Sequence, residues 1–423
     1  MDQENKELKN YPVWHPFTQM QVAGIPPKIV KATGNYLHLE DGSKLLDAVA
    51  SWWVNPFGHG RPELAKAIHD QVLQLDHTIF AGFTHDPALD LSNKLVSLLG
   101  APFSKVFFSD NGSTSVEVAI KMAIQAEVQA KPTQNVTIFT LQDGYHGDTF
   151  GSMSAGRFNG FFDPFKDFLF QTHCLPNPGE DDFLLKLTEA VKIEGAKVII
   201  VEPLIQGAGG MKMYSPQILN TMFRICKENG VRIIADEVMT GFGRTGKMFA
   251  FQWADIRPDF VCLSKCLTGG IMPMGVTLTT QEIFSGFLSD DKSQAFLHGH
   301  SYTGNPVGCA AGLASLALFE AADMPSIWGL HQKKHTQWTS LFKDHPNVSR
   351  CTSQGVVFAM HLKTAGEGYF SGAGNRVQEL AAEKGVLLRP LGNIVYVLPP
   401  FSFSEKDLDQ VFEALQHVAN NWR

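Results

Sequence analysis

The chain has little excess charge and no long apolar run, and each shortage excludes a class of protein. Its 423 residues carry 35 Lys and Arg against 42 Asp and Glu, a net charge of −7, which does not favour binding to nucleic acids. No run of about 18 apolar residues, the length of a membrane span, occurs in it. Residues 1–10 are polar and charged and lack the apolar core of a secretory signal. These features predict a cytoplasmic protein whose ligands are small molecules.

Cysteine is also scarce: six residues are scattered too thinly to form a disulfide framework. Only Cys262 and Cys266 lie close together, and no second pair stands at the spacing of a zinc ribbon, so we predict no metal site. The hydrophobic share of 44% and the charged share of 18% are typical of a globular protein. A chain of this length exceeds the usual size of a single core, which indicates more than one domain.

From about residue 104 onward, short apolar runs alternate with amphipathic stretches of helical length. The runs are rich in Val, Ile and Phe without alternating polar residues, which is typical of strands covered by helices on both faces. Strands alternating with helices predict an α/β fold with a mostly parallel sheet and right-handed crossovers. The predicted strands are 105–110, 136–141, 197–203, 231–238, 258–264 and 275–280, and the predicted helices are 113–129, 181–195 and 216–229.

The two ends of the chain have a different pattern. The first 60 residues are aromatic, turn-rich and weakly periodic, and the C-terminal part contains short predicted strands at 355–362 and 393–400. We therefore predict a large domain of residues 61–310. A smaller α+β domain is expected from residues 1–60 together with residues 311–423.

The segment GFGRTGK (241–247) matches two nucleotide-binding patterns by letters alone. Its glycines fit G-x-G-x-x-G, and Lys247 fits a P-loop, but Met248 stands where a hydroxyl should bind Mg²⁺. Both patterns also require a helix directly after the glycines, and residues 247–260 have no convincing helical periodicity. A tight glycine loop is the stronger interpretation.

Three other segments place reactive groups at the ends of predicted strands. In SDNGSTSVEVA (109–119), Gly112 and Ser113 begin a helix whose N-terminus can bind an anion, although plain capping explains the same residues. Asp236 ends one buried strand, and an ionised carboxylate there needs a cationic or hydrogen-bonding partner. Lys265 ends the next strand, where desolvation would make it a nucleophile; alone, a lysine more often extends to the surface.

Together these groups match the requirements of pyridoxal 5'-phosphate (PLP). The helix N-terminus would bind the phosphate, the aspartate would keep the pyridine nitrogen protonated, and the lysine would hold the aldehyde. Tyr145, in GYHGDTFG (144–151), could stack on the ring, or it could be a half-buried packing residue.

At this point the sequence resembles a known family. The segments DNGSTSVEVAIKMA, GYHGDTFGSMS, VEPLIQGAGG, IADEVMTGFGRTGKMFA, LSKCLTGG and HGHSYTGNP follow the order and spacing of class-III aminotransferases. The resemblance covers residues 10 to about 400 and implies the PLP-dependent transferase fold of type I, with homodimers that share their active sites. Within the class, WHPFTQM, SWW (51–53) and LRPLGNIVYVLPP (388–400) resemble the 7,8-diaminopelargonate aminotransferases of biotin biosynthesis.

The resemblance implies a role for each matching residue. Lys265 would bind PLP and move the proton, Asp236 would pair with the pyridine nitrogen, and Tyr145 would stack on the ring. Gly112 and Ser113 would bind the phosphate, which Ser301 would reach from the partner subunit. The implied substrate-binding residues are Phe17, Trp52, Trp53, Tyr145, Asp148, Arg244, Gly299 and Arg389, of which Arg389 would bind the carboxylate of 7-keto-8-aminopelargonate. Arg244 could instead form a surface ion pair.

Two departures concern the amino donor, which the resemblance gives as S-adenosylmethionine. Phe17 stands where relatives that use this donor usually have tyrosine, and HGHS (298–301) replaces their Gly-Pro-Thr. Both are features of the branch that uses lysine. Three further alternatives remain: a class-III enzyme for ornithine, γ-aminobutyrate or an ω-amine, a decarboxylase or mutase of the same fold, and a non-catalytic binding protein. The pair of tryptophans with Arg389 argues against the first alternative, and the set of Lys265, Asp236 and Tyr145 argues against the last.

Overall fold

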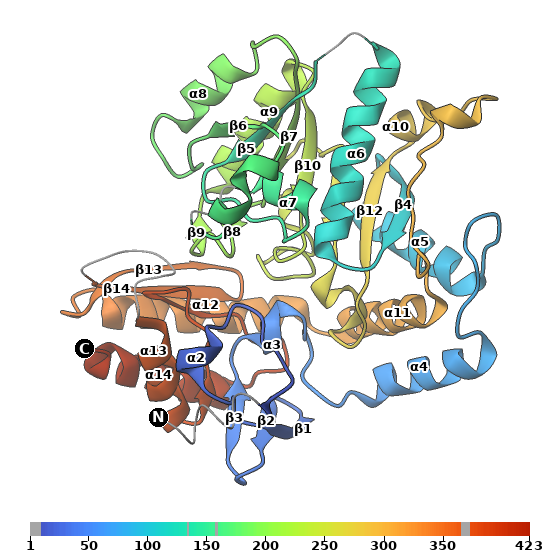
Figure 1. The fold of residues 1–423 in the computed structure, drawn as a ribbon. Coiled ribbons are helices and arrows are strands. Elements are labelled where there is room, and N and C mark those ends of the chain that lie inside the picture. The colour runs from blue at the N-terminus through green and yellow to red at the C-terminus, as the bar shows by residue number, and fades with distance from the viewer. Residues whose placement is uncertain (1–9, 133–134, 157–159, 365–372) are drawn as a thin grey trace.

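A seven-stranded sheet forms the centre of the computed structural model, which describes residues 10–132, 135–156, 160–364 and 373–423 (Figure 1). The strand order is β4-β12-β11-β10-β7-β5-β6. Strands β11, β10, β7, β5 and β6 pair in parallel, and β12 runs antiparallel to both of its neighbours. The predicted α/β fold with a mostly parallel sheet is confirmed. The bounds are Phe103–Ser109 for β4, Thr137–Leu141 for β5, His173–Leu175 for β6, Ala196–Val201 for β7, Arg232–Asp236 for β10, Phe260–Leu263 for β11 and Gly275–Thr280 for β12.

Both faces of this sheet are buried, as the unbroken apolar runs predict. In β7, Val198 and Ile200 belong to the apolar cluster beneath α6, whereas Ile199 and Val201 belong to the larger cluster on the other face. The accompanying helices are α4 (Pro62–Gln74), α5 (Asp86–Leu99), α6 (Gly112–Ala130), α7 (Phe150–Ala155), α8 (Phe183–Ala190), α9 (Pro216–Glu228), α10 (Gln281–Ser285) and α11 (Pro306–Ala321).

Helix α8 is shorter than the helix predicted over residues 181–195. It ends at Ala190, where the amide of Ile193 bonds the carbonyl of Ala190 and begins a turn. Gly195 then has a φ of +81°, a left-handed conformation that stops any continuation of the helix. The apolar periodicity extends past the end of the helix because Val191 still faces the core.

The smaller part of the molecule joins the two ends of the chain. Strands β1, β2 and β3 form a sheet with β15, which pairs in parallel with β3, and β13, β14 and β16 form a second, antiparallel sheet. The α+β part built from both chain ends is thus confirmed, whereas the boundaries at residues 60 and 310 stay a prediction. The bounds are Ile29–Thr33 for β1, Tyr36–Leu39 for β2, Lys44–Asp47 for β3, Val348–Gln354 for β13, Val357–Leu362 for β14, Val386–Leu387 for β15 and Ile394–Val397 for β16.

The remaining elements complete this part and connect it to the large sheet. They are α2 (Met20–Ala23), α3 (Ala50–Trp53), α12 (Met324–Phe342), α13 (Ala373–Glu383), α14 (Glu405–Asn421) and the short pair β8 (Ile205–Gln206) and β9 (Lys212–Met213). Among the described residues, no single helix has the length and apolar character of a membrane span. Helices α11 and α12 meet that criterion only as a pair, bent by 72°.

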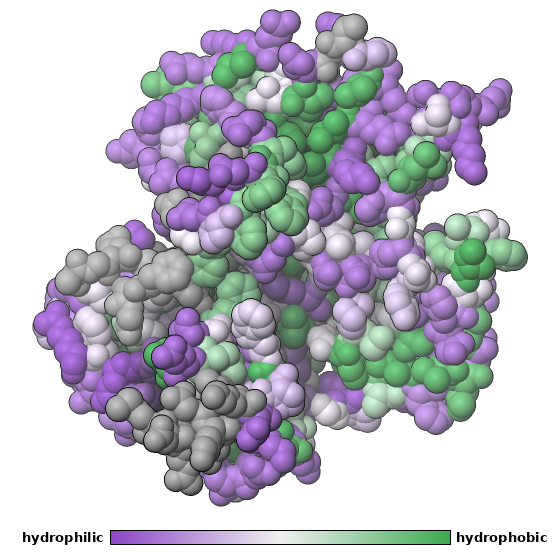
Figure 2. Space-filling model, viewed as in Figure 1, coloured by the Kyte–Doolittle hydropathy of each residue, from purple (hydrophilic) through white to green (hydrophobic). Residues whose placement is uncertain are grey.

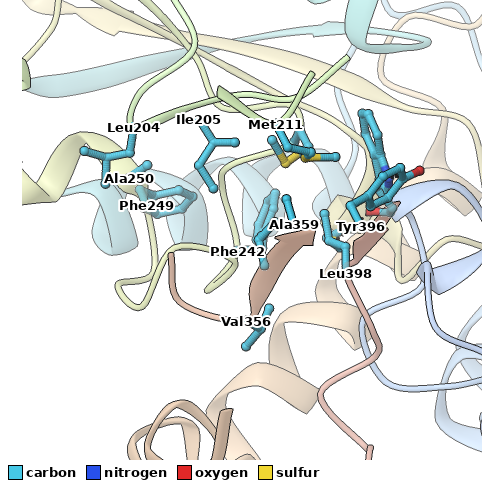
Figure 3. Packing of buried hydrophobic residues seen from close by; sticks show 14 of the residues in the cluster. Leu204, Ile205, Met211, Phe242, Phe249, Ala250, Val356, Ala359, Tyr396 and Leu398 are labelled. Carbon is cyan, nitrogen blue, oxygen red and sulfur yellow. Dashed lines mark hydrogen bonds between the residues drawn. The ribbon is translucent and has the colours of Figure 1, made fainter. Parts of the chain in front are cut away.

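One continuous apolar cluster links the two parts of the molecule. Figure 3 shows a section of it, where Phe242 lies near Val356 and near Ala359 of β14. Phe242 comes from the glycine loop at 241–247, which consists of turns and is followed by a 3₁₀ helix at Ala250–Trp253. The loop thus serves as packing between the two parts, in agreement with the interpretation as a tight glycine loop.

Candidate functional site

A cavity of about 670 Å³ lies at the carboxyl ends of the parallel strands, where ligands bind in open α/β sheets. Seven of the residues singled out from the sequence line it together: Trp53, Gly112, Ser113, Tyr145, Asp148, Asp236 and Lys265. They come from α3, the start of α6 and the segments after β5, β10 and β11. Residues far apart in the chain therefore meet because their strands end at the same edge of the sheet.

Helix α6 begins at the wall of this cavity. The side chain of Asn111 caps it by accepting a hydrogen bond from the amide of Thr114, so the amides of the first turn remain directed at the cavity. At Gly112, a Cβ atom would lie 2.7 Å from Cγ1 of Val238, so only glycine fits this approach. A close backbone, free amides and the hydroxyl of Ser113 are features of a phosphate-binding site.

Lys265 follows β11 and begins a 3₁₀ helix at Lys265–Thr268 with a φ of +45°. Its Nζ lies 4.7 Å from the centre of the Trp53 ring and forms no ion pair within the described part of the chain. Burial lowers the pKa of the lysine, and the negative charges of Asp236 and Glu202 only partly oppose this effect. A desolvated lysine with a lowered pKa is suited to act as a nucleophile and as a proton carrier.

Asp236, the last residue of β10, is 4% exposed. Its Oδ2 lies 2.7 Å from Nδ1 of His146, and its Oδ1 accepts a hydrogen bond from the amide of Val238. The carboxylate therefore has a fixed orientation at the cavity wall. A buried carboxylate held in this way can pair with a cationic ring nitrogen.

Glu202, one residue after β7, is a second buried carboxylate in the cavity wall that the sequence analysis did not single out. Its two oxygens accept hydrogen bonds from the amides of Tyr145 and Gly207, at 3.0 and 2.8 Å. Burial raises its pKa to about 7. Glu202 thus fixes the backbone that carries Tyr145, whose hydroxyl is hydrogen-bonded to Asp148.

Three aromatic and cationic side chains lie together near Trp53. The guanidinium of Arg389 stacks on Trp52, with Cζ 3.8 Å from the ring centre. Phe17 meets the same tryptophan edge to face, with ring centres 5.5 Å apart. The main cavity is not lined by Phe17, Trp52 or Arg389. These residues form a group beside it, since Trp52 is the chain neighbour of Trp53, which does line the cavity. This arrangement offers an apolar wall and one cation.

Arg244 does not form a surface ion pair, and its contact with a substrate stays a prediction. Its side chain is fully buried and does not line the cavity. The guanidinium donates to the carbonyl of Pro399 at 2.6 Å and to Sγ of Cys266 at 3.6 Å, and it stacks on Phe401. Because the glycine loop is packed into the core, Arg244 holds the loop to the C-terminal part of the chain.

Gly299 and Ser301 are exposed and do not line the cavity of their own chain. This position agrees with the implied role in a partner subunit, which a single chain does not test. His146, like Glu202, was missed by the sequence analysis. His146 comes shortly after the predicted strand 136–141, and Glu202 lies at the end of the predicted strand 197–203. The strand-end criterion that found Asp236 could therefore also have found them.

The site fits PLP by the chemistry of its groups. One end of the cavity offers the α6 N-terminus with Gly112 and Ser113, and the other walls offer a fixed carboxylate at Asp236 and a desolvated amine at Lys265. The imidazole Nε2 of His146 is buried without a hydrogen-bond partner among the described residues, so its Nδ1 contact with Asp236 is its one polar link.

Comparisons with known proteins agree with this chemistry. A family model described as aminotransferase class-III matches residues 18–419. The adenosylmethionine-8-amino-7-oxononanoate aminotransferase of Synechococcus elongatus is 42% identical over 414 residues, covering 95% of this chain and 97% of that protein. The enzyme of the same name from Staphylococcus aureus is 35% identical and covers 99% of this chain and 98% of its own length.

Solved structures give the same result. The adenosylmethionine-8-amino-7-oxononanoate aminotransferase of Methanocaldococcus jannaschii superposes with a TM-score of 0.90 at 35% identity, covering 98% of each chain. An amine transaminase from an uncultivated Pseudomonas species, solved in a PLP-bound form, also has a TM-score of 0.90, at 28% identity, and covers 98% of this chain and 99% of its own.

Proposed function

This chain belongs to the class-III aminotransferases and is a PLP-dependent transaminase. From that premise we propose that it converts 8-amino-7-oxononanoate, which is the same compound as 7-keto-8-aminopelargonate, to 7,8-diaminopelargonate in biotin biosynthesis. The acceptor is the one in the names of its relatives, including those at 42% and 35% identity. The same names favour S-adenosylmethionine as the amino donor. A cytoplasmic location goes with a biosynthetic step between small polar molecules.

The convergence of Lys265, Asp236 and Tyr145 on one cavity carries this proposal. PLP, when bound, takes up electrons from the carbon that loses or gains a proton, and so allows an amino group to move between two substrates. Burial lowers the pKa of Lys265, which favours the neutral amine that bonds to the cofactor and moves that proton. Asp236, fixed by His146 and Val238, stabilises a protonated pyridine nitrogen.

The substrate site is assigned to the group beside the cavity. A small movement away from the Trp52 ring would let Arg389 bind a carboxylate with two parallel hydrogen bonds. Trp52 and Trp53 would provide an apolar wall for the alkyl chain of 8-amino-7-oxononanoate, and Asp148, which lines the cavity, would accept a hydrogen bond from its amino group. This arrangement favours a long acceptor with a terminal carboxylate.

A homodimer is part of the proposal, because Gly299 and Ser301 lie away from their own cavity. Large apolar side chains are exposed in residues 73–83 and 297–302, two segments that meet where the rings of His77 and Tyr302 lie 5.4 Å apart: Leu73, Ile79, Phe83, Leu297 and Tyr302 are 61–76% exposed. Figure 2 shows apolar side chains gathered on the lower right of the molecule, where Figure 1 places α4 and α11. A second copy covering this surface would bring Ser301 to the phosphate site of its partner.

Lysine is the alternative donor, and specific residues favour it. Phe17 lacks the hydroxyl that relatives using S-adenosylmethionine present, and its ring instead packs on Trp52. His298 and His300, in HGHS, occupy the surface assigned to the partner's site. The donor is tested on the yellow PLP-bound enzyme by adding each compound separately and following the cofactor absorbance. Loss of the absorbance with S-adenosylmethionine alone supports the proposal. Loss of the absorbance with lysine alone would show that lysine is the donor in place of S-adenosylmethionine. An absorbance that neither compound changes would contradict the assignment to biotin synthesis.

A further inference from the structure

The hydroxyl of Ser113 is held by a chain of hydrogen bonds that ends at a carboxylate. Its Oγ lies 2.8 Å from Oγ1 of Thr149 and accepts a hydrogen bond from the amide of the same threonine at 3.1 Å. Thr149 in turn donates its hydroxyl proton to Oε1 of Glu117 at 2.6 Å. Because that proton is committed to Glu117, the proton between the two hydroxyls belongs to Ser113. Both hydrogen bonds of the serine hydroxyl therefore go to Thr149.

The carboxylate at the end of this chain is itself fixed. Oε1 of Glu117 also accepts hydrogen bonds from the amides of Gly151 and Ser152, at 2.8 and 3.3 Å, where α7 begins. The hydroxyl of Ser152 returns to the carbonyl of Ser113 at 2.8 Å. Helices α6 and α7 are thus joined by one polar network, in which the amides of α7 hold Glu117 whichever way the hydroxyl of Thr149 points.

Two glycines allow this network to form. A Cβ atom at Gly147 would lie 2.3 Å from Oγ of Ser113, and one at Gly151 would lie 2.1 Å from Oε2 of Glu117. Gly147 also has a φ of +120°, which side chains rarely adopt. The segment between β5 and α7 therefore approaches α6 more closely than any other residue type would permit at these two positions.

We propose that Thr149 and Glu117 are positioning residues for the phosphate of PLP, acting through Ser113. A free serine samples several rotamers, whereas this one is fixed with its oxygen at the N-terminus of α6 before a ligand arrives. When a phosphate binds, the serine can turn its proton to the phosphate, and Thr149 can then turn its own proton from Glu117 to Oγ of Ser113, 2.8 Å away. The amide of Thr149 continues to hold the serine oxygen in place. This inference rests on the proposed phosphate site at Gly112 and Ser113.

Thr149→Val tests the inference, because it removes the hydroxyl and leaves the backbone amide and the contacts of Glu117 with α7. We expect the dissociation constant of PLP to rise roughly tenfold, the effect of losing one buried hydrogen bond. Binding of pyridoxal, which lacks the phosphate, should not change. Thr149→Ser keeps the hydroxyl and should bind PLP as the unmodified protein does. Thr188→Val is the matched control, since its hydroxyl donates to the carbonyl of Leu184 within α8, far along the chain from the phosphate site.

The effect must also depend on Ser113. In a Ser113→Ala background, Thr149→Val should change PLP binding less than about twofold, because the group it positions is gone. An equal effect in both backgrounds, or an equal loss of pyridoxal binding, would show a general structural role and overturn the inference. If Thr149→Val does not fold, as judged by thermal unfolding, Glu117→Gln replaces it. That variant keeps an acceptor for Thr149 but holds its side chain less tightly. We expect the dissociation constant of PLP to rise about threefold, and only when Ser113 is present.

The two proposals fail in different ways. If Ser113→Ala itself leaves PLP binding unchanged, the phosphate does not lie at this serine and the proposed site is wrong. If Ser113→Ala weakens PLP binding but neither Thr149→Val nor Glu117→Gln does, the phosphate site stands and the positioning role is wrong. Equilibrium dialysis of PLP and pyridoxal gives all of these values without a measurement of turnover.

Discussion

Nδ1 of His146 lies 2.7 Å from Oδ2 of Asp236, and the two side chains are 1% and 5% exposed. The histidine comes from the segment after β5 and the aspartate from the end of β10, two strands that are separated in the sheet by β7. Their hydrogen bond fixes the carboxylate from a second strand end. The orientation of Asp236 therefore depends on an imidazole that also lines the cavity.

Replacing this imidazole should weaken cofactor binding. In His146→Phe the ring remains, but the carboxylate loses a donor, and a buried carboxylate short of hydrogen bonds is less stable when ionised. We expect the dissociation constant of PLP to rise about tenfold and the turnover number to fall. His69→Phe, at a position where the side chain is 70% exposed, is the control. Unchanged PLP binding in His146→Phe would contradict the role given to the pair.

Lys265→Ala should separate cofactor binding from chemistry. The contacts at Ser113 and Asp236 remain, so the variant should still bind PLP without a covalent bond to the protein. Turnover should fall by about three orders of magnitude or more, because the nucleophile and the proton carrier are lost together. Steady-state kinetics and absorbance spectra of the same preparation provide the test. Substantial residual turnover would show that another group moves the proton.

Arg389→Ala should affect one half of the reaction. We expect the KM for 8-amino-7-oxononanoate to rise about 100-fold, since a carboxylate loses its cationic partner, while the reaction with the donor changes far less. Each half-reaction is measured separately by the absorbance of the cofactor. Arg376→Ala is a suitable control, because Arg376 is exposed and, among the described residues, its ion pair is with Glu379 on its own helix. Equal damage to both halves would mean that Arg389 has another role.

Glu237 should make stability depend on pH. Burial raises its pKa to about 7, above the ordinary glutamate value of 4.5, although it accepts hydrogen bonds from Thr240, Ala250 and Phe251. A carboxyl whose pKa is higher in the folded state stabilises the fold below pH 4.5, and this contribution is lost as the pH rises through about 7.

Glu237→Gln should remove that part of the pH dependence. Relative to the variant, the unmodified protein should lose roughly 1.4 kcal/mol of unfolding free energy per pH unit between pH 4.5 and 7. Urea unfolding at pH 5 and pH 7 measures the difference, with Glu413→Gln on the exposed face of α14 as control. A difference between the two proteins that does not vary with pH would contradict this assignment.

The sequence predicts the part of the site that depends on local pattern. Asp236 and Lys265 stand at the ends of buried apolar runs, which predict strands. Gly112 and Ser113 stand at the start of an amphipathic stretch with a capping residue, which predicts a helix N-terminus. Their convergence follows because parallel strands end at one edge of the sheet. The same reasoning gives the order of alternating strands and helices, and it is accurate to within a few residues except at α8.

Other features depend on contacts between distant segments, which no local pattern contains. Arg244 stands in a loop of polar and glycine residues, yet Phe242 draws that loop into the core and buries the guanidinium against Pro399. Strands β1, β2 and β3 have weak periodicity because β1 is largely exposed, and their sheet is completed by β15 from the other end of the chain. Glu202 and His146 were missed although each follows a strand, because neither residue type by itself indicated PLP.

The central claim, amino transfer to 8-amino-7-oxononanoate, is tested most directly by a single turnover. The enzyme is first loaded with an amino group by excess donor, the donor is removed, and 8-amino-7-oxononanoate is added. Mass spectrometry should then detect about one 7,8-diaminopelargonate per active site, while the PLP absorbance returns, as a two-step transfer requires. The account would be contradicted if the loaded enzyme gave no 7,8-diaminopelargonate but passed its amino group to a different oxo acid. That result would identify the chain as a class-III aminotransferase for another acceptor.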